Sequence, residues 1–141
     1  MGKINWARVL SGGLLAGVVM FALGFVFYGM WLSKEFNAAM QALGRPPMAE
    51  TAGTMVFILV MSLISGIIAV WFYAAIRPRF GPGPKTAACA GFGVWVIGGL
   101  LPTIWYASLD LFPRAYMAKD AGAGLVLWVI ATVVGAWAYK E

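Results

Sequence analysis

Arg77-Pro78-Arg79-Phe80-Gly81-Pro82-Gly83-Pro84-Lys85 is the most densely basic stretch of a chain whose residues are otherwise mostly apolar. Proline lacks the amide donor that a helix needs, and glycine favours turns, so this composition predicts a loop with no helix across residues 77–85. Long apolar runs lie on both sides of the stretch. If those runs cross a bilayer, the stretch lies at a water interface, and its positive charges indicate which interface.

The composition is that of a membrane protein. Hydrophobic residues make up 62% of the 141 residues and charged residues 11%, against about 25% charged in soluble proteins. The mean hydropathy is +0.87. The net charge of +5 comes from basic residues near the ends of apolar runs, a placement typical of a topology signal rather than of a phosphate-binding patch. We therefore expect membrane lipids, and no nucleic acid, as partners.

Four apolar runs extend outward from the basic stretch. They cover residues 54–76 and 86–109 on its two sides, and residues 9–32 and 121–139 towards the chain ends. Each is close to the ~20 residues that cross a hydrocarbon core of about 30 Å. The sequence predicts an all-α polytopic membrane protein, with one transmembrane domain over residues 1–141 folded as a four-helix transmembrane bundle.

Residues 33–50 form the longest polar interval, and we expect a short interfacial amphipathic helix within it. Its apolar positions recur at helical spacing, at Phe36, Ala39, Met40 and Leu43. Ser33 is placed to cap the start of this helix and Gly44 to end it. The alternative is an ordered loop packed on the end of the bundle. Residues 110–120 are expected to form a second, shorter loop.

Basic residues are divided unequally between the two sides of the membrane that these spans define. One side carries six and the other carries four: Lys3, Arg8, Arg77, Arg79, Lys85 and Lys140 against Lys34, Arg45, Arg114 and Lys119. Positively charged loops favour the cytoplasm. We therefore expect both termini to be cytoplasmic, with tryptophan and tyrosine rings gathered at both membrane interfaces.

Small residues recur four positions apart in every predicted span, a spacing that lets two helix backbones approach closely. The pairs are Gly13 and Gly17, Ser62 and Gly66, Ala87 and Gly91, and Ala131 and Gly135. They are candidates for helix packing, either inside the bundle or on the face of a homo-oligomer or larger membrane complex. Because all four spans have such a pair, packing inside the bundle is favoured.

Catalytic and metal-binding constellations are missing from the sequence. There is no histidine, Cys89 is the single cysteine, and no ionisable residue lies in the middle of a predicted span. These observations argue against metal or haem ligation, thiol–disulfide chemistry and proton-coupled transport. Asp110 is the nearest acid, at a helix end where a solvated or paired carboxylate is ordinary. We expect no enzyme activity, and no cofactor other than a bound lipid or other apolar molecule.

Two groups of residues are candidates for ligand contact. The first group, with anionic lipid headgroups as the expected partner, is Arg77, Arg79 and Lys85. As a topology signal these residues need no partner. Trp95 and Trp128 lie several residues inside their spans, and Pro102 is expected to kink the third span. Together these three are candidates to line an apolar pocket, while the alternative is that the tryptophans face lipid or fill the core.

Two functions are consistent with these features. The first is a non-enzymatic accessory or scaffold subunit that acts through helix–helix and lipid contacts, motivated by the small-residue pairs and the lack of buried charge. The alternative is a binder or carrier of a neutral apolar molecule, such as a quinone, a carotenoid or a lipid, in a pocket within the bundle.

Five short segments carry a resemblance to a known group of proteins. They are Ile4-Asn5-Trp6, Gly12-Gly13-Leu14-x-Ala16-Gly17, Arg77 to Lys85, Trp95-Val96-Ile97-Gly98 and Gly135-Ala136-Trp137-x-Tyr139-Lys140-Glu141. In these segments the chain resembles small bacterial four-span membrane proteins of the domain-of-unknown-function type. The resemblance covers essentially the whole chain. It implies a bacterial inner-membrane location, but no activity and no site residues.

Overall fold

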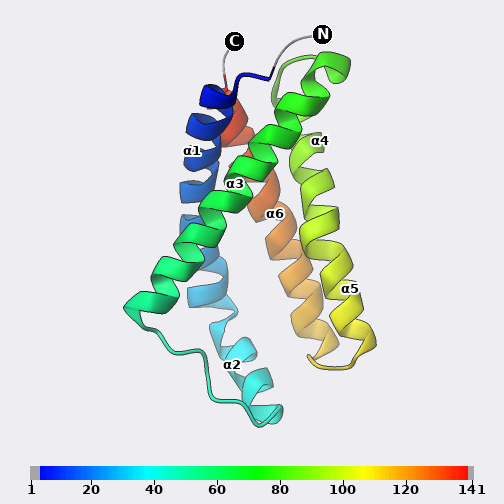
Figure 1. The fold of residues 1–141 in the computed structure, drawn as a ribbon. Coiled ribbons are helices and arrows are strands. Elements are labelled where there is room, and N and C mark those ends of the chain that lie inside the picture. Colours follow the sequence, from blue (N-terminus) through cyan, green and yellow to red (C-terminus); the bar gives the residue numbers. More distant parts are fainter. Residues whose placement is uncertain (1–3, 140–141) are drawn as a thin grey trace.

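Four long helices form the body of the computed structural model, which describes residues 4–139 (Figure 1). The first comprises α1 (Trp6–Gly24) and its π-helical continuation η1 (Phe25–Trp31), and the second is α3 (Ala52–Phe80). The third comprises α4 (Pro84–Trp95), the π-helical η2 (Val96–Leu100) and α5 (Leu101–Ser108), and the fourth is α6 (Arg114–Ala138). Each is long and apolar enough to cross a membrane. The prediction of an all-α membrane protein with a four-helix bundle is confirmed.

Successive long helices run in opposite directions, so the turns gather at two ends of the bundle (Figure 1). One end holds the start of α1, the α3–α4 turn and the end of α6, and we call it the basic end because Arg77, Arg79 and Lys85 lie there. Across this end the Asn5 amide donates a hydrogen bond to the Tyr139 hydroxyl, at 3.3 Å. The loops therefore group as the four predicted spans require.

The opposite end holds α2 (Ser33–Ala42) and the α5–α6 turn (Figure 1). The Phe36 ring of α2 stacks against Phe112, with 6.2 Å between ring centroids, so the predicted amphipathic helix packs on the end of the bundle. Gly44 follows with a φ of 71°, as expected for a residue that ends a helix. Ser33 does not cap α2 as predicted, because it is already the first helical residue and Leu32 occupies the cap position.

The basic stretch is more helical than its composition predicts. α3 continues through Pro78 to Phe80, so the prediction that residues 77–85 contain no helix is wrong. Pro78 has no amide to donate and its ring crowds the carbonyl four residues back, yet these effects do not end the helix here. The Gly81 amide still donates to the Arg77 carbonyl oxygen at 2.8 Å and closes the final turn.

The turn itself is confined to residues 81–83. Gly81 and Gly83 adopt φ values of 81° and 133°, which glycine reaches without the steric cost of a side chain. Pro84 then begins α4, at a position where a missing amide costs nothing. The glycines therefore make the turn, while two of the prolines lie in or at the start of helices.

Helix boundaries extend beyond the apolar runs. α6 begins at Arg114 rather than at residue 121, so the predicted loop over residues 110–120 is wrong beyond Pro113. The other spans are Trp6–Trp31, Ala52–Phe80 and Pro84–Ser108, against predicted ranges of 9–32, 54–76 and 86–109. Hydropathy marks the part of a helix that lies in hydrocarbon, whereas backbone hydrogen bonding carries the helix on into the polar interface.

Two π-helical segments interrupt the α-helical hydrogen bonding. In η1 the Leu32 amide donates to the Phe27 carbonyl oxygen, five residues back, at 2.8 Å. η2 ends two residues before Pro102, and the Leu101 amide reaches back to the Val96 carbonyl oxygen. Pro102 has no amide to donate, so the disturbance predicted at this proline takes the form of a widened turn just before it.

The tightest of the helix contacts lies where α1 crosses α3. A Cβ atom added to Gly66 would overlap the backbone of both Gly13 and Gly17. Conversely, a Cβ on Gly17 would lie 2.5 Å from the Leu63 Cα, and one on Gly13 would lie 2.5 Å from the Ile67 Cα. The two backbones are in direct contact, so this crossing tolerates only a hydrogen atom as the side chain at these positions.

Two further crossings involve α6. A Cβ added to Gly135 would lie 2.7 Å from the Gly12 carbonyl oxygen and from the Ala16 Cβ, both on α1. A Cβ on Gly91 of α4 would lie 2.9 Å from the Trp128 carbonyl oxygen. α6 therefore packs closely against both α1 and α4.

The remaining small residues of the predicted pairs also lie in the interior or beside these crossings. Ala87 and Ala131 are buried, and the Ser62 hydroxyl donates to the Ile58 carbonyl oxygen at 2.8 Å. The Ser62 carbonyl oxygen lies against Gly17. All four pairs therefore lie in the interior of the bundle or beside a crossing between helices of the same chain.

Aromatic rings expected at the membrane interfaces differ in their exposure. Trp6, Trp105 and Trp137 are exposed on the outer surface, where membrane interfaces favour them. Tyr73 and Tyr139, expected at the same interfaces, are instead 3% exposed. Each of these tyrosine hydroxyls accepts a hydrogen bond from a backbone amide at the basic end, which explains why the rings lie inside it.

We expect Gly66→Ala to destabilise the protein by about 1–3 kcal/mol, a typical effect of overpacking a tight interior, because the added methyl group must separate α1 from α3. Thermal unfolding and the yield of monodisperse protein after detergent extraction measure this effect. Gly122→Ala is the matched control, since it lies in α6 and a Cβ there meets nothing within 4 Å. Equal stability of the two variants would mean that α1 and α3 do not touch at Gly66.

Candidate functional site

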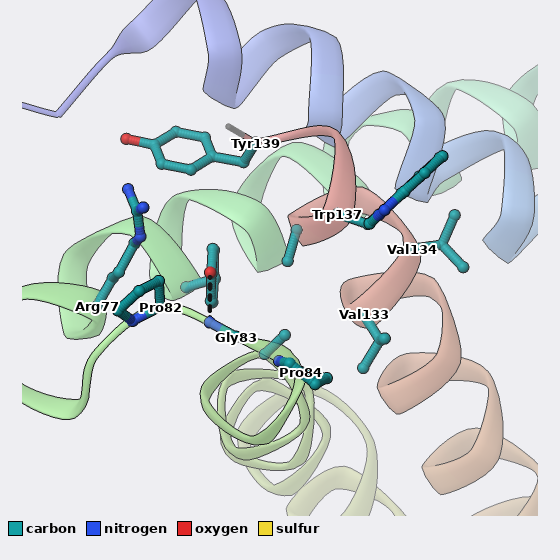
Figure 2. A pocket seen from close by; sticks show the side chains of 11 residues that line it. Arg77, Pro82, Gly83, Pro84, Val133, Val134, Trp137 and Tyr139 are labelled. Atoms are coloured by element: carbon teal, nitrogen blue, oxygen red, sulfur yellow. Dashed lines mark hydrogen bonds between the residues drawn. The ribbon is translucent and has the colours of Figure 1, made fainter. Parts of the chain in front are cut away.

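A pocket of about 610 Å³ opens at the basic end between α3, α4 and α6, and we call it the basic-end pocket (Figure 2). Val133, Val134 and Trp137 of α6 form one wall, and the turn from Pro82 to Pro84 lies across from them (Figure 2). Arg77 and Tyr139 lie on the remaining side. The volume is within the roughly 300–1,000 Å³ of small-molecule sites, and most of the lining side chains are apolar.

Hydrogen bonds and ring contacts hold the walls of this pocket in place. The Gly83 amide donates to the Tyr73 hydroxyl at 3.3 Å, drawn as the dashed line in Figure 2. The Thr86 hydroxyl donates to the Phe80 carbonyl oxygen at 3.3 Å. The Tyr73 and Tyr139 rings meet edge to face, with 6.0 Å between centroids. The α3–α4 turn is therefore tied to α3, and the first turn of α4 is tied to the last residue of α3.

Arg77 is the one basic residue of the three headgroup candidates that lines the basic-end pocket. Its guanidinium carbon lies 5.6 Å from the centroid of the Tyr139 ring, in cation–π geometry (Figure 2). Arg79 and Lys85 are exposed on the outside of the same end and do not line the pocket. The sequence analysis did not distinguish the residue that lines the pocket from the two that lie outside it.

A second pocket, of about 260 Å³, lies closer to the opposite end, and we call it the aromatic pocket. The three residues predicted to line an apolar pocket, Trp95, Pro102 and Trp128, all line it. Trp95 is buried, and its indole NH donates to the Ala121 carbonyl oxygen at 3.1 Å. The structure therefore brings these three predicted residues together, around a space that is more polar than the apolar pocket that was predicted.

Asp120 also lines the aromatic pocket, and the sequence analysis assigned it to a loop. It lies in the second turn of α6, where the Thr103 hydroxyl donates to its Oδ2 at 3.2 Å. Tyr28 lines the same pocket. The accessory-subunit hypothesis was motivated by a lack of buried charge. Asp120, a half-buried acid, is an exception to that observation.

A signal for Asp120 is present in the sequence. Tyr116, Asp120, Gly124 and Leu127 recur at helical spacing, and the structure turns all four towards the interior. Continuing the helical pattern back from the apolar run to Pro113 places the carboxylate on the buried face of α6. The charged residues around Asp120 led to the prediction of a loop, because the fourth helix was expected to begin only where the apolar run begins.

No protein-family model matches the chain, and no curated protein or solved structure matches it either. The resemblance to small bacterial four-span proteins stays a prediction. The two pockets are therefore the basis on which a function is inferred.

Proposed function

We propose that this chain is a non-enzymatic membrane protein that binds an anionic amphiphile, such as a phospholipid or a fatty acid, in the basic-end pocket. The observation that carries the proposal is an apolar volume of about 610 Å³ with Arg77 among its lining residues. This is the binder-or-carrier hypothesis, with a charge now assigned to the head of the ligand.

The apolar wall on α6 supports the lipid-chain part of the proposal. Val133, Val134 and Trp137 lie along one side of the pocket, and Trp137 is 72% exposed (Figure 2). Inside a bilayer an acyl chain is already out of water, so what this wall offers it is close dispersion contact along several carbons. Tryptophan at this end also matches the depth at which headgroups meet acyl chains.

The charges of the basic end support the anionic head. A lysine or arginine near an anionic membrane surface contributes about 1 kcal/mol, and Arg79 and Lys85 add to the field at the pocket mouth. The planar guanidinium of Arg77 offers paired donors that suit a phosphate or carboxylate group. A hydrocarbon carotenoid has no acceptor for this group, and a quinone carbonyl is a weaker acceptor than an anionic phosphate or carboxylate.

The accessory-subunit hypothesis also stays a prediction, but the small-residue pairs no longer favour it. Gly13, Gly17, Gly66 and Gly135 meet other helices of the same chain, so these four glycines do not form a free face for a partner. A scaffold function would therefore need a different surface.

We also propose a location in the bacterial inner membrane, with the basic end and both termini in the cytoplasm. The charge distribution supports this orientation. At the opposite end Lys119 lies 2.6 Å from Glu35, and Arg114 lies 4.0 Å from Asp110, so positive charge there is locally balanced. Loops with excess positive charge stay on the cytoplasmic side.

Filling the basic-end pocket is expected to reduce lipid retention. Val134→Phe places a bulky ring in the wall, so the protein extracted in a mild detergent should retain less phosphatidylglycerol, by fivefold or more, as measured by native mass spectrometry. Val126→Phe is the matched control, because Val126 lies on the same helix, is exposed and does not line the pocket. The mass of the retained molecule also distinguishes a phospholipid from a fatty acid. Equal retention by both variants contradicts the proposed site.

The headgroup charge is tested separately. Arg77→Gln should reduce retention of phosphatidylglycerol relative to phosphatidylcholine, whereas Arg77→Lys keeps much of the preference. Arg79→Gln removes one positive charge from the same turn outside the pocket and should change the preference little. If Arg77→Gln and Arg79→Gln behave alike, the ligand is held by the general surface charge and not by this pocket.

Reporter fusions test the orientation. A fluorescent protein that folds only in the cytoplasm should be bright when inserted after Gly81, and alkaline phosphatase should be active when inserted after Asp110. Each insertion lies in a turn between long helices, which leaves the four spans intact. Phosphatase activity from the Gly81 insertion would reverse the proposed topology.

A further inference from the structure

The aromatic pocket combines one carboxylate with four aromatic side chains. Tyr28, Trp95, Tyr106 and Trp128 line it together with Asp120. Among the described residues that line the pocket, Asp120 is the only charged one. The site is separate from the basic-end pocket and differs from it in size and in the sign of its charge.

The positive side chains closest in sequence to Asp120 are engaged elsewhere. Lys119 lies 2.6 Å from Glu35 of α2, and Arg114 lies 4.0 Å from Asp110. Asp120 instead accepts a hydrogen bond from the Thr103 hydroxyl, at 3.2 Å. A carboxylate has about four lone-pair directions, so this donor leaves it able to face a cation.

The aromatic rings determine which kind of cation suits the pocket. Ring faces attract weakly hydrated cations, and quaternary ammonium groups are recognised by aromatic cages of this composition. A bare metal ion needs several oxygen ligands, and residues 4–139 contain no group of three or more acidic or cysteine residues that could hold one. The pocket therefore favours an organic cation over an inorganic one.

Both π-helical segments contribute to this pocket. Tyr28 lies in η1, and Gly98 and Gly99 lie in η2. A Cβ on Gly99 would lie 2.9 Å from Trp95 Cδ1, so this glycine leaves the space in which the indole sits. π-helical turns are rare and often accompany functional sites. Here they widen two helices at the same place.

We propose that the aromatic pocket binds a small organic cation with an alkylammonium group, whose charge is balanced by Asp120 and whose methyl groups contact the aromatic rings. A neutral apolar ligand would leave the half-buried carboxylate without a counter-charge, which is the costlier arrangement.

Calorimetric titration of the detergent-solubilised full chain with choline tests the proposal. 3,3-Dimethylbutan-1-ol, the neutral carbon analogue of choline, is the ligand control. The parent protein should bind choline, and should bind the neutral analogue at least about tenfold more weakly. No binding of choline, or equal binding of the two molecules, overturns the proposal.

Asp120→Asn keeps the shape of the side chain and removes its charge, so it should weaken choline binding by at least about tenfold. Asp110→Asn is the control, because that side chain is 80% exposed and does not line the pocket. If Asp120→Asn fails to give a monodisperse protein, Trp128→Leu is compared with Trp105→Leu, an exposed position outside the pocket. Choline affinity should fall in Trp128→Leu only, and equal affinity within either pair overturns the proposal.

Discussion

Direct backbone contact between α1 and α3, at Gly13, Gly17 and Gly66, is the constraint on which the rest of the structure depends. In a bilayer, lipid chains are as apolar as the helices, so close dispersion contact rather than the hydrophobic effect holds helices together. α1 also meets α6 at Gly12 and Gly135, and α6 meets α4. α1 and α6 together therefore position all four long helices.

The close contacts of α1 lie towards the basic end, because Gly12, Gly13 and Gly17 are in the first half of the span Trp6–Trp31 and Gly135 is in the last turn of α6. α3 crosses the bundle obliquely in Figure 1. At the basic end, Tyr73 and Tyr139 meet edge to face beside the basic-end pocket. Towards the opposite end, the aromatic pocket lies around Asp120. The two spaces available for ligands thus lie towards different ends of the bundle.

The spans were predictable because long apolar runs have few alternatives, and the small-residue pairs were predictable because their spacing matches the helix repeat. The continuation of α3 through Pro78 was not predictable from the composition of this stretch. The turn is made by the glycines, and the proline near the end of the helix does not stop it. The start of α6 was missed because hydropathy reports membrane depth and not helix length. Because of that error, Asp120 was not considered as a residue of the helix. The pockets could not be predicted either, because they depend on how the helices diverge, which composition does not encode.

The intramolecular nature of the glycine contact is the central claim, because it removes these residues from any interface between copies. Solid-state NMR of the protein in lipid bilayers measures it directly, through the backbone cross-peak between Gly17 and Gly66 in selectively labelled protein. The cross-peak should be present, and its intensity per labelled chain should not change on dilution with excess unlabelled protein. An absent cross-peak, or one that falls in proportion to the dilution, would contradict the account and place these glycines elsewhere.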